Sequence, residues 1–142
     1  MDKITFKLTK VKYGIDEIES DAVNIFIDGE NFLDAIHAYE KFHKINGEHV
    51  PITPYELYQS LAEDYLTESV PIYGCICGLI DCCPVYVSIS VNENSVTWDN
   101  FIFPDEFFSR SHKPRKKFHK LTFDKAQYLD EIEKLKNFSE LC

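Results

Sequence analysis

The chain of 142 residues contains little glycine and proline, five and six residues respectively, and this disfavours a disordered polypeptide. No apolar run reaches the roughly 18 residues that a membrane-spanning helix needs. The first ten residues, MDKITFKLTK, contain no long apolar stretch, so we expect no secretory signal and a cytoplasmic protein. With 44% hydrophobic and 14% aromatic residues, the composition predicts one globular domain spanning residues 1–142.

The common catalytic and nucleotide-binding signatures are also missing. The sequence has no P-loop, no G-x-G-x-x-G, no G-x-S-x-G and no H-E-x-x-H. The segment IDGEN has one glycine, and its two acids would repel a phosphate. We therefore predict a binding protein that is not an enzyme and that carries no cofactor. An enzyme of unknown class, with a cysteine or histidine at its centre, is the alternative.

Cysteine is unevenly distributed, because four of the five cysteines lie within residues 75–83. An odd number cannot form a complete set of disulfides, so we expect reduced thiols. The C-x-C and C-C spacings differ from the pairs of structural zinc sites and from a C-x-x-C dithiol. The cluster therefore predicts the buried start of a strand and no metal. The alternative is a zinc- or thiol-dependent protein built on Cys75, Cys77 and Cys82, completed by His112 or His119.

The histidines show no catalytic spacing. His37 and His43 lie six residues apart on a predicted helix, and His49 follows in a predicted loop. We expect all of them to be at the surface or partly buried. A Cys/His nucleophilic pair has no local signature here, although such partners meet in space rather than in sequence.

Negative charge is concentrated in the body of the chain. Residues 13–109 hold 18 acids and two bases, a net charge of −16, whereas residues 110–120 hold six lysines or arginines and no acid. Such a body would repel nucleic acid and attract a basic protein, for example a toxin domain. The expected partner-binding acids are Glu17, Glu19, Asp21, Asp28, Glu30 and Asp34. We expect the basic segment to be a solvated loop, with Phe118 as a stacking residue if it binds RNA instead.

Hydrophobic periodicity predicts an α+β fold: a mainly antiparallel sheet with a central hairpin, packed by about three helices. Strands are predicted at residues 3–8 and 22–27 and within PIYGCIC. In the hairpin, alternation places Val85, Val87, Ile89 and Val91 on one face. On the returning strand it places Val96 and Trp98 on one face and Phe101 and Phe103 on the other.

Three helix starts share one signature, a capping residue before an apolar staple. Asp28 is the predicted cap of the first helix, which Asn46-Gly47 ends. Thr53 with Pro54 begins the second, and Asp124 begins the third.

Three groups of residues together form a pattern: C-x-C-G-x-x-x-C-x-P, then V-x-W-x-x-F-x-x-P, then F-D-x-x-Q-Y. The pattern is carried by Cys75, Cys77, Gly78, Cys82, Pro84, Val96, Trp98, Phe101, Pro104, Phe123, Asp124, Gln127 and Tyr128. Over residues 24–135 the chain thus resembles a family of small uncharacterised bacterial proteins. The resemblance implies one domain of bacterial origin and assigns no functional residues. Among binding functions, we expect an immunity-type inhibitor that neutralises a basic, nuclease-like toxin.

Overall fold

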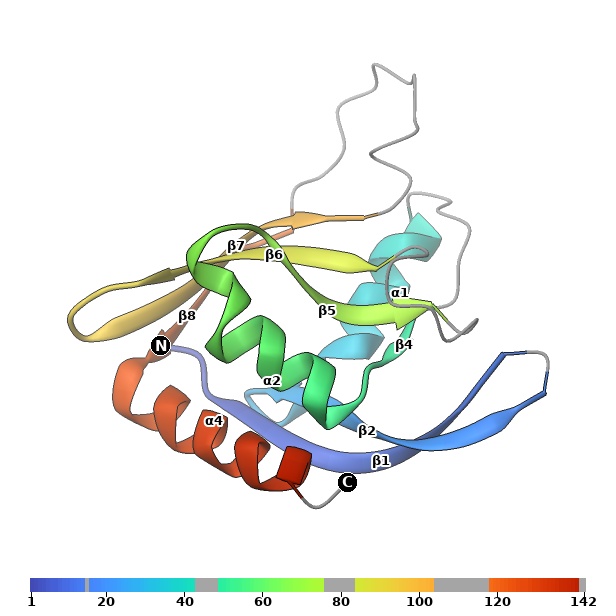
Figure 1. Ribbon diagram of the computed structural model, residues 1–142. Coiled ribbons are helices and arrows are strands. Elements are labelled where there is room, and N and C mark those ends of the chain that lie inside the picture. The colour runs from blue at the N-terminus through green and yellow to red at the C-terminus, as the bar shows by residue number, and fades with distance from the viewer. Residues whose placement is uncertain (15, 43–48, 76–83, 104–117, 141–142) are drawn as a thin grey trace.

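The computed structural model describes residues 1–14, 16–42, 49–75, 84–103 and 118–140 (Figure 1). It confirms the predicted α+β class, with two antiparallel sheets and, within these ranges, three α-helices. Several predicted features lie outside the described residues: the helix stop at Asn46-Gly47, the cysteines Cys77, Cys82 and Cys83, the histidines His43 and His112, and residues 110–117.

The smaller sheet has the order β1-β2-β3, formed by Ile4–Tyr13, Ile18–Ile27 and Glu30–Asn31. Its first strand lies at the edge of the sheet, and both long strands extend well beyond the predicted ranges. Between β2 and β3 the chain reverses at Asp28 and Gly29, whose φ angles are 51° and 85°. Two consecutive positive φ angles are typical of the tight turns that join antiparallel strands.

The larger sheet has the order β4-β5-β6-β7-β8. Its strands are His49–Pro51, Val70–Cys75, Val85–Val91, Ser95–Ile102 and Leu121–Asp124. The two sheets meet where the Val23 amide donates a hydrogen bond to the Ile52 carbonyl, with 3.0 Å between nitrogen and oxygen.

The predicted orientation of the side chains on the returning strand is wrong, because β7 contains a bulge. The register shifts between β6 and β7, and Asn100 has a φ of 53°. One extra residue reverses the inward–outward alternation of a strand. Trp98 and Phe101 are therefore both buried, at 0% and 8% exposed, instead of lying on opposite faces. Along β6, Val85 and Val87 are buried, and Ile89 is partly buried against the core.

The helices are α1 (Phe32–Phe42), α2 (Pro54–Ala62) and α4 (Lys125–Glu140), with a short 3-10 helix η1 (Asp64–Leu66) after α2. The predicted caps of two helices are confirmed, because Thr53 Oγ1 accepts from the Glu56 amide and Asp124 Oδ2 accepts from the Gln127 amide.

The predicted cap of the first helix is wrong. Asn31 Oδ1 accepts from the Leu33 amide at the start of α1. Asp28 instead accepts from the Lys3 amide, because the turn that follows β2 pairs it with β1.

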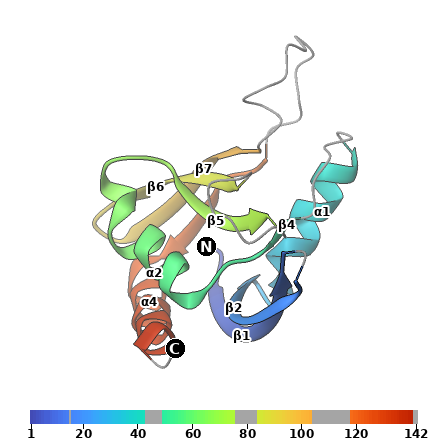
Figure 2. The same cartoon turned by 45° about the vertical axis from the view of Figure 1, so that its right-hand side comes forward.

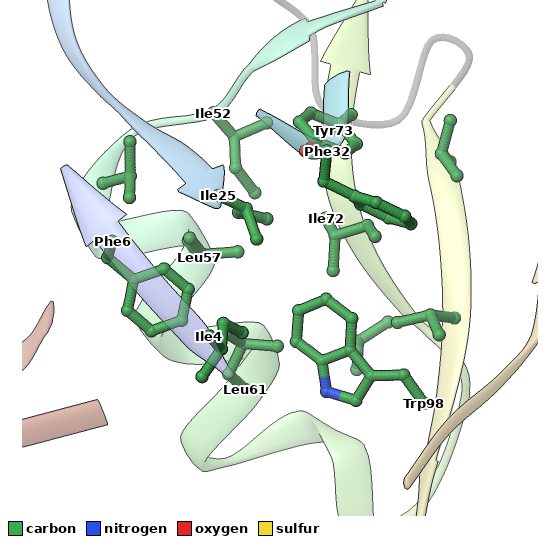
Figure 3. Close-up of a cluster of buried hydrophobic side chains, with 14 of the residues drawn as sticks. Ile4, Phe6, Ile25, Phe32, Ile52, Leu57, Leu61, Ile72, Tyr73 and Trp98 are labelled. Atoms are coloured by element: carbon green, nitrogen blue, oxygen red, sulfur yellow. The ribbon is translucent and has the colours of Figure 1, made fainter. Parts of the chain in front are cut away.

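One apolar core fills the space between the two sheets and the helices. Figure 2 shows α2 and α4 side by side, with α1 on the other side of the molecule. Side chains from both sheets and from α2 point into a shared interior (Figure 3). Trp98 lies in this interior and is completely buried.

Candidate functional site

The six predicted partner-binding acids do not form one surface. Glu17 lies in the turn between β1 and β2, whereas Asp28 follows the other end of β2. The ten residues of β2 separate these two ends by about 30 Å. Glu30 and Asp34 lie with Asp28 at the start of α1, and all three are exposed.

Lysines of β1 partly neutralise the acids near the hairpin turn. Asp21 forms an ion pair with Lys10, with 2.5 Å between Oδ1 and Nζ. Glu19 lies directly opposite Lys12 in the same ladder. Opposite charges on neighbouring strands attract each other, so this end of the sheet is less negative than the sequence indicates.

A more compact acidic feature is a hollow of about 340 Å³ between α2, η1, β5 and β6. Carboxylates of Glu56, Asp64 and Glu68 line it, and the rings of Tyr55 and Tyr86 lie beside them. No lysine or arginine is among the described residues that line this acidic hollow.

Two of these carboxylates have no cationic partner in the part of the chain that the structure describes. Glu56 and Glu68 form no ion pair with any residue in the described ranges, and Gln59 donates to Asp64 across 3.5 Å. Burial, together with the smaller effect of the nearby Glu56 charge, raises the pKa of Tyr13 to about 12. A site with several acids and two aromatic rings can hold a lysine or arginine side chain.

A second cluster joins α1 to β4. His49 Nδ1 donates to Glu40 Oε1 across 2.5 Å, and the two residues are only 2% and 4% exposed. One turn earlier on α1, His37 Nε2 donates to the His49 carbonyl across 2.9 Å. The prediction that His49 lies in a surface or partly buried position is therefore wrong. Its short strand pairs with β5 and is covered by α1, a tertiary arrangement that no local pattern indicates.

Cys75 lies beside this pair. It ends β5 as a half-buried thiol and is the register partner of His49 in the β4–β5 ladder. A bulge between Pro71 and Tyr73 reverses the alternation of β5. Pro71 consequently lines the acidic hollow, whereas Tyr73 turns into the core. Directly paired residues of antiparallel strands project from the same face, so Cys75 and His49 are side-chain neighbours.

Tyr73 is fully buried, and its hydroxyl has no hydrogen-bond partner within the described part of the chain. Burial holds the pKa of Tyr73 well above its usual value, and the charge of Asp34 raises it further. The phenol is therefore neutral at physiological pH.

The residues of the C-terminal part of the sequence pattern make structural contacts. Trp98 Nε1 donates to the Tyr128 hydroxyl across 3.1 Å, and both rings pack edge-on or stacked against Phe123. The Gln127 side chain accepts from the Ile4 amide and donates to the Ile4 carbonyl. These residues thus connect β7, β8 and α4 to β1.

Neither the zinc alternative nor the RNA alternative gains support. Two of the three proposed zinc ligands, Cys77 and Cys82, lie outside the described ranges, and no group of three metal-ligating side chains occurs within them. Phe118 is half-buried, and its ring packs against Phe32 and Tyr39 at centroid distances of 5.5 and 5.3 Å. Because this ring already packs against two other rings, the structure gives no support to the alternative in which Phe118 stacks on RNA bases.

Comparisons with protein-family models, curated proteins and solved structures find no match to this chain. No helix within the described ranges is long and apolar enough to cross a membrane.

Proposed function

We propose that this protein is a small acidic binding protein of the cytoplasm, an immunity-type inhibitor that neutralises a basic, nuclease-like toxin. The observation that carries the proposal is the acidic hollow, in which Glu56 and Glu68 lack ion-pair partners among the described residues. A nuclease binds phosphates with lysines and arginines. Carboxylates spaced around a hollow can form ion pairs with those same cationic side chains and so keep them from binding phosphates.

The tyrosines support the same proposal. Tyr55 lines the acidic hollow and is 65% exposed, and Tyr86 of β6 lines the same hollow. Tyrosine and arginine are enriched at the centres of protein interfaces. A guanidinium that enters the acidic hollow could gain cation–π contacts with these rings together with its ion pairs.

The acids predicted from the sequence have a secondary role in this proposal. Glu17, Glu30 and Asp34 are exposed and stay candidates for attracting a basic partner over long range. Asp21 and Glu19 are weaker candidates, since lysines of β1 lie opposite them. The net charge of −9 repels nucleic acid and speeds encounter with a cation.

The test begins with a tagged chain, used to capture its partner from the source cell for identification. The captured protein is then expressed in a second host, with and without this chain. We expect a basic protein that stops growth alone and is tolerated together with this chain. An acidic partner, or a basic one whose toxicity is unchanged, would contradict the proposal.

Association rates then locate the surface. The variant Glu56→Gln with Glu68→Lys should slow association about tenfold or more at low salt. The first change keeps a residue suited to the capping box of α2. On α4, Asp130→Asn with Glu133→Lys makes the same change in net charge on exposed residues and is the matched control. Equal rates for the two variants would show that the acidic hollow does not bind the partner.

A further inference from the structure

A carboxylate, an imidazole and a thiol lie one after another in the corner formed by α1, β4 and β5. Glu40 contacts His49 directly, and His49 is the cross-strand neighbour of Cys75. The Cβ atoms of such neighbours are about 4.5–5.5 Å apart, which brings a thiol within reach of an imidazole. This cluster lies apart from the residues that line the acidic hollow.

The carboxylate determines which imidazole nitrogen carries the proton. An ionised carboxylate only accepts hydrogen bonds, so its contact with Nδ1 places the proton of a neutral imidazole there. The other nitrogen, Nε2, is then the basic one. Burial of Glu40 and His49, together with the bond from His37 to the His49 carbonyl, fixes the ring in place.

We propose that Cys75 is a nucleophile that His49 activates as a base, with Glu40 as the positioning residue, and that the site accepts activated acyl groups such as esters or thioesters. The thiol proton passes to His49 Nε2 while the sulfur bonds to the acyl carbon. The leaving alcohol or thiol departs with that proton. Water then hydrolyses the acyl-enzyme, which releases the acid and restores the thiol.

Two observations favour this chemistry over a purely structural role. Cys75 is half-buried, so a small acyl donor can reach it, whereas the base and the acid behind it are shielded from water. Burying a histidine with a glutamate also costs desolvation energy, which two apolar residues would avoid.

The test treats the intact chain with p-nitrophenyl acetate and measures the acetylation of each cysteine by peptide mass. Cysteines 77, 82, 83 and 142 are internal controls. We expect Cys75 to react at least tenfold faster than any of them at neutral pH. The midpoint of its pH–rate profile should lie below about 8.5, the value for an ordinary thiol. Cys75→Ser should abolish the rapid release of p-nitrophenolate.

Two further variants separate the role of His49 as the base from that of Glu40 as the positioning residue. His49→Asn keeps a donor toward Glu40 and removes the base, so acetylation of Cys75 should slow about 100-fold. Glu40→Gln should slow it less and move the pH midpoint upward. Circular dichroism checks that each variant is folded. The proposal is overturned if Cys75 reacts no faster than the control cysteines in the unmodified chain. It is also overturned if a folded His49→Asn variant retains the full rate.

Discussion

The two ends of the five-stranded sheet bury their polar side chains in opposite ways. At the β7–β8 end, the buried Trp98 indole and the Tyr128 hydroxyl satisfy each other within an aromatic cluster. At the β4–β5 end, Glu40 and His49 are buried as an acid–base pair, and the Tyr73 hydroxyl has no partner in the described ranges. The buried groups at the β7–β8 end stabilise the fold, whereas those at the β4–β5 end lower its stability.

General magnitudes support this contrast. Removing an aromatic side chain from a core costs about 3–5 kcal/mol. A buried ion pair is often no better than two apolar residues of the same size, and an unsatisfied buried hydroxyl costs about 1–3 kcal/mol. We therefore infer that the polar end is kept for chemistry, and substitutions at the two ends can test this difference.

The largest effect is expected at the aromatic end. Trp98→Ala should lower the free energy of unfolding by about 3–5 kcal/mol, because it opens a cavity and leaves the Tyr128 hydroxyl without its donor. Urea denaturation followed by circular dichroism measures the change. A loss below about 1 kcal/mol would be incompatible with the burial of Trp98.

At the polar end, His49→Leu should lower the free energy of unfolding by about 3 kcal/mol, because it leaves the buried Glu40 carboxylate unpaired. Glu40→Leu should cost less, about 1–3 kcal/mol, because a neutral imidazole then loses a single acceptor. The same denaturation experiment compares the two variants. If both are as stable as the parent, the pair is not buried as described.

A matched pair of tyrosine substitutions compares the two ends at a smaller scale. Tyr128→Phe removes the acceptor of the Trp98 indole and should cost about 1–2 kcal/mol. Tyr73→Phe removes a hydroxyl that has no described partner and should be neutral or stabilising by about 1 kcal/mol. Equal losses in the two variants would show that the Tyr73 hydroxyl is bonded in the folded protein.

The smallest effect is confined to alkaline solution and concerns Tyr13, whose hydroxyl donates to the Pro51 carbonyl. Its pKa of about 12 in the folded protein exceeds the value of about 10 in an unfolded chain. A raised pKa means that its contribution is complete below pH of about 10 and is lost as the pH rises through about 12. Denaturation midpoints across this range should therefore fall less steeply in Tyr13→Phe than in the parent. Parallel profiles would contradict the raised pKa.

Local signals were sufficient to predict much of the fold. Thr53 and Asp124 cap their helices as predicted, because a cap depends on residues three or four positions away. Asp28 was equally suitable as a cap, but pairing with Lys3 placed it in a turn. Whether Asp28 or Asn31 caps α1 depends on a strand 25 positions away in the sequence. No local pattern therefore shows it.

The sites were harder to predict because they depend on long-range register. Glu19 and Asp21 form an acidic stretch in the sequence, yet the ladder places lysines of β1 opposite them. No pattern in the sequence links Glu40 and His49 to Cys75, and their proximity depends on the packing of α1 and the pairing of two strands. Bulges at β5 and β7 add single-residue shifts that alternation alone misses.

The most direct test of the contrast is the stability of the double variant Glu40→Leu with His49→Leu. If the pair is kept for chemistry, the double variant should unfold within about 1 kcal/mol of the parent, or be more stable, although each single variant is destabilised. A double variant whose loss equals the sum of the two single losses would contradict the account. The pair would then be part of what stabilises the fold.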